Sequence, residues 1–479
     1  MMNRMFVYLC VLSTFFMLIA CAVNPVTGKR EFMLVSEADE IAMGQQSDPQ
    51  IVAQYGVYND EKLNKYLNDL GQKMAAISHR PSLNYEFKVV DSPIINAFAV
   101  PGGYVYFTRG IMAYLNNEAE LAGVLGHEIG HITARHSAQQ ISQAQVAQVG
   151  LGIGSVISPT FAQFAGMAGQ GIQLLFLKFG RDDERQSDKL GVEYSTKIGY
   201  DAREMANFFY TLDRMSGGDE GGGLPSWMST HPPSEERVVN VRRMAEERQK
   251  TLDVNRLKVD RDEYLAMIDG LIFGDDPLQG YVENDVFYHP DLRFQFPTPQ
   301  GWNTVNTPSK VGMVSPDKKA MMILIATPGT LAEIEQGFVK EFGVTVNSSN
   351  SKTVNGLQAR VMEGSVPQQD GTVGLLAYFI QHDNLIYVLY GYAYSQDYGN
   401  NKQTFLATMN GFSKLTDQSK INVKPNRIRV KTVSRGGTLQ DVLKAYRVAD
   451  DNLELLALVN GMKLTDNVAA GSKIKLIEK

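Results

Sequence analysis

Two histidines four residues apart, with a glutamate directly after the first, are the side chains in this chain best suited to catalysis. His127, Glu128 and His131 form an H-E-x-x-H motif. On an α-helix, positions i and i+4 share a face, so both imidazoles can bind one metal ion. Glu128 would point to the adjacent side, within reach of a water on that metal. Two neutral imidazoles and a carboxylate that takes a proton from water are the parts of a zinc hydrolase.

The alternative is a helix that carries two histidines by chance. The chain has only 7 histidines, and three of them fall between positions 127 and 136. The surrounding sequence also predicts the helix independently of the motif. Asn117 can cap it, with Glu120 three residues later as in a capping box. An apolar stripe follows at helical spacing, formed by Leu121, Val124, Leu125 and Ile129.

A zinc site needs a third protein ligand, and a second predicted helix offers one. Glu184 and Asp188 recur at helical spacing in residues 181–199, and Gly199 can end this helix. Packed against the first helix, Glu184 would complete a His, His, Glu set and leave the fourth position to water. Asp188, one turn later, could accept an N–H from a ligand histidine. The charges of residues 181–185 fit a solvated face equally well, so spacing alone leaves both alternatives open.

The sequence HEIGHxxxRH, followed by E-x-x-x-D from Glu184, resembles the HtpX/BepA type of zinc metallopeptidase, a gluzincin family that includes the CAAX-prenyl protease. Residues 96–103 are similar to the family segment before the catalytic helix. Residues 230–233, with Arg237, resemble the His-Pro segment after the third ligand. The resemblance covers roughly residues 24–250. It implies one Zn²⁺ per chain, Glu128 as general base, and three ligands: His127, His131 and Glu184.

His231, in the loop after the third ligand, has three possible roles. It can bind the developing oxyanion, occupy the open zinc position and hold the enzyme latent, or be purely structural. The resemblance favours an active-site role without choosing between activity and latency. Arg237 is likewise predicted to be catalytic, holding a substrate carbonyl; pairing with Glu235 or Glu236 is the alternative. Asp188 and His136 are predicted to support the metal ligands from behind.

Residues 85–90 alternate as a strand, and residues 96–108 predict two more around Pro101-Gly102-Gly103. A strand edge beside a zinc helix can pair with an extended substrate, and covering the core is compatible with that role. This assigns substrate binding to Asn96, Ala97, Phe98 and Ala99. Between residues 136 and 177, His136 is the only side chain that can carry a charge. We interpret that stretch as a lid over the site, with a packed helical pair as the alternative.

The N-terminus has the features of an export signal. Arg4 precedes an apolar run that ends at Ala20, and residues 18–21 have the form of a lipobox. This resembles a bacterial lipoprotein signal, which implies cleavage before Cys21 and a lipid on its thiol. An uncleaved anchor is the alternative, and it too would hold the protein at a membrane. Ala22 after the cysteine indicates outer-membrane sorting. The mature chain would keep only Cys21 and no internal disulfide.

The rest of the chain predicts two accessory domains. Residues 288–414 contain alternating strands with a helix over 330–342, and FQFPTPQGW resembles the PsbP/Mog-type α/β fold. We expect a binding or scaffolding role there. Residues 422–479 resemble a LysM domain, which implies binding of peptidoglycan. Gly437 stands where that family usually has Asp, and the Pro that often closes the last strand is missing, so docking of a protein is an equal alternative.

With 479 residues, the chain is long enough for several domains. Its formal net charge of −6 and the lack of a basic patch give no support to nucleic acid binding. The predicted fold is α+β: a mainly helical zincin-type protease domain with a small β-sheet, an α/β domain, and a small LysM-like βααβ module. The predicted domains are the signal peptide (1–20), the zinc metallopeptidase (21–275), the α/β domain (276–420) and the LysM-like module (421–479).

The predicted function is a zinc endopeptidase, lipid-anchored in the bacterial envelope and facing the periplasm. Its expected substrates are misfolded or unassembled envelope proteins. A first alternative is a peptidoglycan-docked adaptor or chaperone with a structural or latent zinc site. A second is an enzyme that acts on the cell wall, which only the LysM-like segment suggests.

Overall fold

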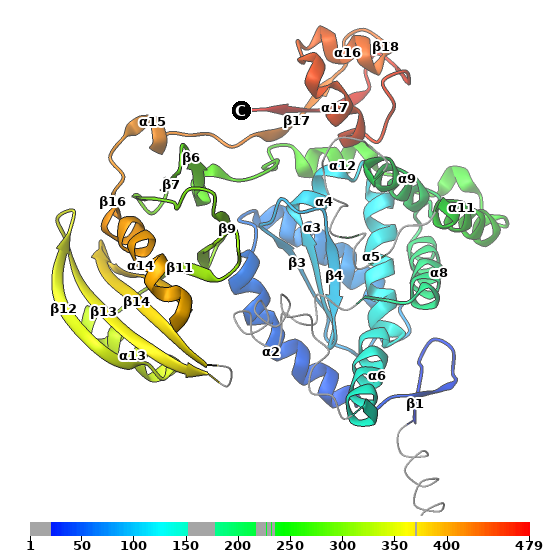
Figure 1. Cartoon of the computed structure of the whole chain (residues 1–479). Helices are drawn as coiled ribbons and strands as arrows, with labels where there is room; N and C mark the ends of the chain where they lie inside the picture. The colour runs from blue at the N-terminus through cyan, green and yellow to red at the C-terminus, as the bar shows by residue number, and fades with distance from the viewer. Residues whose placement is uncertain (1–20, 152–177, 217–226, 228–230, 232–234, 369–370) are drawn as a thin grey trace, which may run out of the picture. The chain divides into compact units, whose positions relative to one another are not determined.

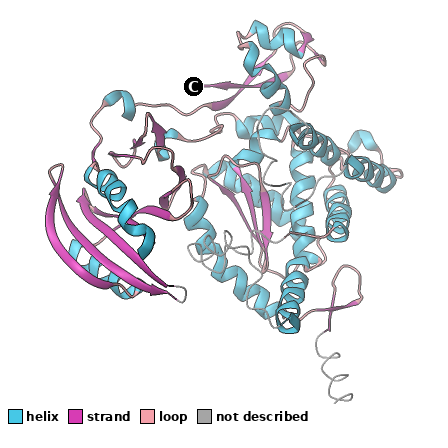
Figure 2. Cartoon of the chain, in the orientation of Figure 1, coloured by secondary structure: helices cyan, strands magenta, loops and turns pink. Residues whose placement is uncertain are grey.

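The computed structural model describes residues 21–151, 178–216, 227, 231, 235–368 and 371–479 (Figure 1). Its helices and sheets confirm the predicted α+β class (Figure 2). Contacts group the chain into two compact units. The first comprises residues 1–52, 56–274 and 426–478, and the second is built mainly from residues 275–425. The predicted signal peptide and the part of the predicted lid beyond residue 151 lie outside the described residues.

In the first unit, a small sheet lies beside the helix that carries H-E-x-x-H. The strand order is β3-β5-β4, with β3 parallel and β4 antiparallel to β5. Strand β4 is therefore one of the two edge strands, and it packs against helix α5 (Figure 1). The two strands predicted around the Pro101 turn are present as this β4–β5 hairpin. The bounds are β3 (Glu86–Val90), β4 (Ala97–Val100), β5 (Tyr104–Thr108) and α5 (Glu118–Thr133).

Helix α5 is the centre of the main hydrophobic core. Every residue from Ala119 to Thr133 is buried, including the apolar stripe predicted from spacing. Asn117 caps the helix, and its Oδ1 accepts the N–H of Glu120 at 2.7 Å. The other main helices of this unit are α2 (Glu37–Tyr55), α3 (Glu61–Ala75), α4 (Arg109–Tyr114), α6 (His136–Leu151), α8 (Arg181–Lys197), α9 (Glu204–Ser216), α11 (Glu235–Gln249) and α12 (Arg261–Ile268), of which α3, α6, α8, α9 and α12 contact α5.

Two glycines allow α5 and α8 to approach closely. A Cβ at Gly126 would lie 3.0 Å from the Cα of Gly191, and a Cβ at Gly191 would lie 2.9 Å from the carbonyl oxygen of Gly123. Any side chain at these positions would push the helices apart. This contact determines how near α8 can bring Glu184 to the histidines of α5. Helix α8 stops before Gly199, whose φ of 93° suits the expected end of the helix.

Residues 426–478 form a small module within the same unit. Strand β17 (Arg427–Thr432) pairs antiparallel with β20 (Lys473–Glu478), and helices α16 (Leu439–Ala445) and α17 (Leu453–Val459) lie between them in sequence. The two short strands β18 (Gly437–Thr438) and β19 (Asn467–Val468) also pair. This is the predicted βααβ order. The module has its own core, yet Ile428 and Val459 also belong to the core around α5.

A buried lysine fastens this module to the segment in front of α5. Lys475 is 0% exposed, and its Nζ donates to the carbonyl oxygens of Ala113 and Leu115, both at 2.8 Å. Arg261 of α12 adds a hydrogen bond to the carbonyl of Asn116 at 2.9 Å. The carbonyls at the end of α4 are thus satisfied by side chains from residues far later in the chain.

Glu120, in the first turn of α5, is buried beside these cations. Its Oε2 accepts the N–H of Asn116 at 2.7 Å. Burial raises the pKa of the Glu120 carboxyl, and the nearby carboxylate of Glu204 raises it further. The Asn116 N–H, Lys475 and Arg261 lower it in part, and the pKa in the folded protein is about 8. Between pH 4.5, the ordinary pKa of a glutamate, and pH 8, Glu120 therefore keeps its proton in the folded protein and loses it in the unfolded chain.

We expect the stability contributed by Glu120 to be complete below pH 4.5 and to be lost as the pH rises toward 8. Glutamine does not titrate, so the melting temperature of Glu120→Gln should rise relative to wild type between about pH 5 and pH 8. Burial lowers the pKa of Lys475, which has the opposite effect on stability, and Glu120 opposes that lowering in the wild-type protein. Thermal melts at several pH values test this, and parallel curves would contradict it.

The second unit contains a seven-stranded antiparallel sheet in the order β12-β13-β14-β15-β11-β10-β9. Alternate residues of β14 face opposite sides: Leu376 packs in the cluster of Phe405 on α14, and Phe379 packs with Phe338 on α13. The elements are β9 (Asn303–Thr307), β10 (Lys310–Val314), β11 (Ala320–Thr327), α13 (Leu331–Phe342), β12 (Thr345–Val354), β13 (Leu357–Gln368), β14 (Gly371–His382), β15 (Leu385–Tyr394) and α14 (Ser395–Asn410).

A smaller four-stranded sheet in the order β16-β8-β7-β6 completes this unit. Its strands are β6 (Tyr281–Glu283), β7 (Val286–His289), β8 (Phe294–Pro297) and β16 (Ser413–Lys414). The alternating stretches of the sequence are thus strands, and the helix expected over 330–342 is α13. Across both units, no helix in the described part of the chain is long and apolar enough to cross a bilayer.

Candidate metal centre

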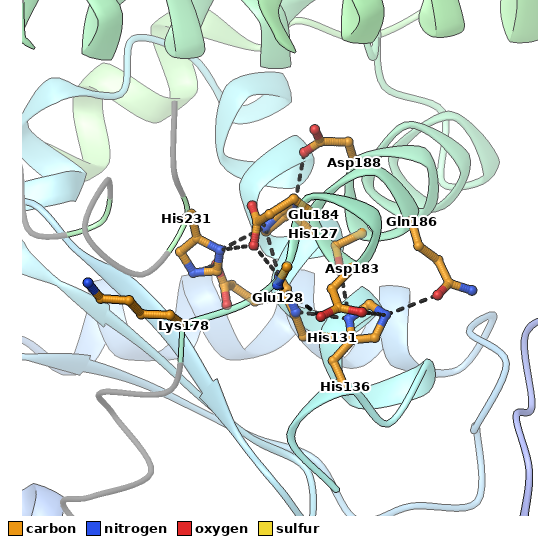
Figure 3. Close-up of polar contacts among 12 residues, drawn as sticks. His127, Glu128, His131, His136, Lys178, Asp183, Glu184, Gln186, Asp188 and His231 are labelled. Carbon is orange, nitrogen blue, oxygen red and sulfur yellow. Dashed lines mark hydrogen bonds and ion pairs between the residues drawn. The ribbon is translucent and has the colours of Figure 1, made fainter. Parts of the chain in front are cut away.

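Four buried side chains from α5, α8 and the segment before α11 converge on one point (Figure 3). One ligand atom each from His127, His131, Glu184 and His231 lies within 4.8 Å of all the others. The two Nε2 atoms of His127 and His131 are 3.0 Å apart, and Nδ1 of His231 is 2.8 Å from Oε1 of Glu184. Each of these residues is no more than 4% exposed. The structure therefore brings together the three predicted zinc ligands and His231.

The chemistry of this donor set fits a zinc ion. Burial, followed by the neighbouring His127 and His136, holds the pKa of His131 well below its usual value, so its imidazole is neutral. Burial raises the pKa of Glu184, but His231 and Arg237 outweigh it and leave the carboxyl ionised. Oε2 of Glu184 is buried and has no aligned hydrogen bond among the described residues. A neutral imidazole at His131 and an ionised carboxylate at Glu184 are donors of the kind that bind zinc.

Each histidine of the motif is held by a partner on its other ring nitrogen. Nδ1 of His127 lies 3.0 Å from Oδ1 of Asp188. Nδ1 of His131 lies 3.0 Å from Nδ1 of His136, whose Nε2 is 3.0 Å from Oε1 of Gln186. These contacts turn both Nε2 atoms toward the centre, which is how supporting residues orient metal ligands. Asp188 and His136 thus lie where a supporting role was predicted (Figure 3).

Arg237 of α11 lies behind the cluster with its guanidinium buried. Its Nε and Nη2 donate to the two oxygens of Asp188, both at 2.7 Å, and Nη2 lies 2.9 Å from Oε2 of Glu184. Burial raises the pKa of Asp188, but Arg237 and His127 more than offset this and hold the pKa at about 2. Nη1 of Arg237 has no hydrogen-bond partner among the described residues. The guanidinium therefore fixes two carboxylates and keeps one free donor.

Glu128 is 1% exposed and points toward the same centre. Its Oε1 accepts a hydrogen bond from the indole Nε1 of Trp227 at 3.3 Å and lies 3.8 Å from Nε2 of His231. The Trp227 ring stacks on His231 at 4.7 Å between centroids and 23° between planes. Sequence reasoning gave Trp227 no role. The one available signal was that this residue, one of only two tryptophans, lies four positions before His231.

The residues predicted to bind substrate lie on or next to the edge strand. Among the described residues, β4 pairs only with β5, so its outer edge is open. Ala97 is fully buried, and Phe98 packs on Tyr106 with ring centroids 5.0 Å apart. Oδ1 of Asn96 is buried and has no partner in the described structure. The backbone N–H of Trp227 donates to the carbonyl of Ile95 at 3.1 Å, which ties this edge to the metal centre.

Comparisons with known proteins agree with this geometry. The model of peptidase family M48 matches residues 61–245. Beta-barrel assembly-enhancing protease of Yersinia pestis is 31% identical over 230 residues, covering 46% of this chain and 47% of that protein. The protein of the same name from Escherichia coli K12 is 28% identical over 230 residues with the same coverage. Mitochondrial metalloendopeptidase OMA1 of Arabidopsis thaliana is 31% identical over 184 residues, 38% of this chain and 36% of that protein.

The chain thus spans about half the length of the bacterial relatives it matches. Among solved structures, cyanobacterial PsbP from Synechocystis sp. PCC 6803 aligns with 29% of this chain and 98% of its own, at 14% identity and a TM-score of 0.25. That score supports no conclusion, so the PsbP-like fold of the accessory domain stays a prediction. Residues 61–245 contain the H-E-x-x-H helix, Glu184 and His231. Through that segment the chain is similar to peptidase family M48.

Proposed function

We propose that this protein is a membrane-anchored zinc metalloendopeptidase that cleaves misfolded or unassembled proteins of the bacterial envelope. The observation that carries the proposal is the buried set of His127, His131, Glu184 and His231 within 4.8 Å, with Glu128 beside it. The match to peptidase family M48 supports the activity. The names of the bacterial relatives, beta-barrel assembly-enhancing proteases, support a role in the envelope.

In this mechanism His127, His131 and Glu184 hold the zinc ion, which when bound makes water acidic enough to ionise near pH 7 and polarises a peptide carbonyl. Glu128 removes the proton from the attacking water and later delivers it to the leaving amine. The N–H of Trp227 keeps the Glu128 carboxylate turned toward the centre. Nη1 of Arg237, or the ring of His231, donates to the oxygen of the carbonyl under attack.

Substrate binding is proposed for the open edge of β4, where residues 96–99 lie. An extended polypeptide can add there as a further strand through main-chain hydrogen bonds. Such pairing needs no particular side chains, and it requires a segment that is not already folded. A preference for unfolded or unassembled proteins follows from this mode of binding.

Cleavage of an unfolded protein is the direct test. The mature chain, prepared from Ala22 and loaded with zinc, should cleave casein. Removal of the metal with a chelator should stop cleavage, and added zinc should restore it. Cell-wall fragments serve as the comparison, because cleavage of muropeptides without cleavage of casein would instead favour the enzyme that acts on the wall. A folded, zinc-loaded protein that cleaves neither would contradict the proposed activity.

A second candidate, a latent enzyme or adaptor, is favoured by the position of His231. Its Nδ1 lies 2.8 Å from Glu184 and 3.3 Å from Nε2 of His127, among the atoms that would bind the metal. An imidazole at this position can take the place that water needs. Trp227 stacks on the ring of His231 and helps to hold it there.

If His231 holds the enzyme latent, His231→Ala should increase casein cleavage about tenfold, since that factor corresponds to only about 1.4 kcal/mol of competition between imidazole and water. The zinc content should stay the same, because three ligands remain. His289→Ala, a histidine of the second unit, is the matched control and should leave the rate unchanged. A fall in the rate for His231→Ala at full zinc content would instead assign His231 to the oxyanion.

Anchoring is proposed through a lipid on Cys21, with the protein facing the periplasm from the outer membrane. Cys21→Ser should move the protein from the membrane to the soluble fraction of cells. Binding of peptidoglycan is proposed for the module at 426–478, and sedimentation of the full chain with isolated cell walls tests it. A full chain that stays in the supernatant would favour docking of a protein by this module.

A further inference from the structure

The first described residues form a hairpin whose two faces differ in chemistry. Strand β1 (Cys21–Val23) pairs antiparallel with β2 (Arg30–Phe32), and the register places Cys21 opposite Phe32, Ala22 opposite Glu31 and Val23 opposite Arg30. Directly paired residues project to the same side of a sheet. Val23, Arg30 and Phe32 therefore share one face, and Ala22 and Glu31 share the other.

The face with Glu31 is fixed to the protein. The Glu31 carboxylate accepts hydrogen bonds from Nε2 of Gln139 and, at 3.0 Å, from Nδ2 of Asn24. Nδ2 of Asn24 also lies within 3.3 Å of the carbonyl oxygen of Ala134, just after the zinc-binding helix. The hairpin thus cannot rotate about its own axis without breaking these hydrogen bonds.

The chain after β2 continues the same alternation. Met33 and Val35 are buried in a cluster with Ala138 of α6, and the N–H of Leu34 donates to Oγ of Ser142 at 2.9 Å. Residues 31, 33 and 35 therefore face the protein, and residues 30, 32 and 34 face away from it. The side chains of residues 30, 32 and 34 point away from the protein because those of residues 31, 33 and 35 are hydrogen-bonded to it or packed in its core.

The outward face is apolar and basic. Val23 is 51% exposed, Phe32 43% and Leu34 46%. Arg30 lies among them, and Lys29 precedes it in the turn; both are exposed, and neither forms an ion pair with any described residue. Apolar side chains beside unpaired cations suit the boundary between lipid tails and anionic headgroups.

We propose that this face, formed by Val23, Arg30, Phe32 and Leu34, lies against the surface of the lipid bilayer. The inference rests on the proposed anchoring at Cys21. Val23 follows Cys21 by two residues, roughly 7 Å in an extended strand, so the lipid would enter the membrane beside the face. An uncleaved N-terminal anchor would bring the bilayer to the same place.

The bilayer contact would orient the peptidase as well as hold it. A lipid on a cysteine alone leaves the attached protein free to turn. Here the hairpin is bonded to Ala134 and Gln139, on either side of the turn from α5 to α6. A face seated on the membrane through these bonds sets the direction of α5, and with it the direction of the metal centre, relative to the lipid surface.

The mature chain has no cysteine besides Cys21, so Phe32→Cys supplies a single free thiol in the lipidated protein. We would attach a polarity-sensitive fluorophore to it and reconstitute the full chain in vesicles of phosphatidylethanolamine and phosphatidylglycerol. The emission should shift to the blue and be quenched by nitroxide-labelled lipid chains. Val239→Cys, at a site 65% exposed on α11, should stay water-like. Water-like emission from both positions would overturn the proposal.

A second measurement does not depend on the lipid. The chain from Ala22 should co-sediment with the same vesicles, and Phe32→Ser with Leu34→Ser should weaken this about tenfold. Val239→Ser with Leu252→Ser removes two other exposed apolar side chains and should have no effect. Mass spectrometry will show whether Cys21 carries a lipid. If it carries none and the chain still binds vesicles, the proposed anchoring is wrong but the proposed bilayer contact stands. Self-association through this face in place of vesicle binding would overturn the inference.

Discussion

Glu128→Gln is expected to abolish peptide cleavage without loss of the metal. Glutamine has nearly the same shape, and its side-chain oxygen can still accept the hydrogen bond from Trp227, which is 3.3 Å from Glu128. An amide cannot take a proton from water or return one to the leaving amine. General acid–base catalysis contributes about 10²–10⁴-fold, and Glu128 serves in both directions, so we expect kcat to fall about 10³-fold or more.

The measurement is the initial rate of casein cleavage, with the zinc content of each protein determined beside it. Glu193→Gln is the matched control, because Glu193 lies on α8 but pairs with Lys197 at 2.8 Å, away from the cluster. That variant should keep the wild-type rate. A Glu128→Gln protein that retains zinc and also retains activity would remove Glu128 from the mechanism.

Arg237→Met is expected to destabilise the metal-free protein by about 3–5 kcal/mol. The guanidinium is bound by both oxygens of Asp188 and lies 2.9 Å from Glu184, and it sits between the rings of Phe209 and Trp227 at 4.5 and 4.9 Å. Methionine can fill much of this space. It cannot neutralise Asp188, whose pKa of about 2 shows how strongly the folded state favours the charged form.

Chemical denaturation of the metal-free proteins measures this effect. Combining Arg237→Met with Asp188→Asn removes both charges and should recover part of the loss, because the penalty comes from the unpaired carboxylate. Arg242→Met, on the same helix but bonded to Asn207 at an exposed site, is the control and should cost about 1 kcal/mol or less. If the Arg237 and Arg242 variants lost the same free energy of unfolding, the buried ion pairs of Arg237 would contribute little to stability.

Much of the centre could be predicted because its signals are local. The spacing of His127 and His131, the cap at Asn117 and the apolar stripe lie within one helix, where the 3.6-residue repeat fixes which side chains share a face. Glu184 was harder to assign. Its spacing was equally that of a solvated charged face, and what brings it inward is the close approach at Gly126 and Gly191, which no periodicity reveals.

The remainder depends on contacts between distant parts of the chain. The hydrogen bond from Trp227 to Glu128 spans 99 residues, and that from Arg237 to Asp188 spans 49. The buried Lys475 looked in sequence like one of several lysines on an alternating strand. Its contact with Ala113 follows only from how the module packs against the rest of the unit that contains α5. Sequence patterns describe faces of elements, and they do not specify which faces meet.

The bonds from Lys475 to Ala113 and Leu115 also impose an order of events on the maturing protein. They close loops of 362 and 360 residues, so they are among the last contacts that a chain emerging from its N-terminus can make. Until β20 has been synthesised, the segment in front of α5 lacks the side chain that satisfies its carbonyls. The contacts that fasten the segment before the H-E-x-x-H helix are therefore completed only when the last residues of the chain are available.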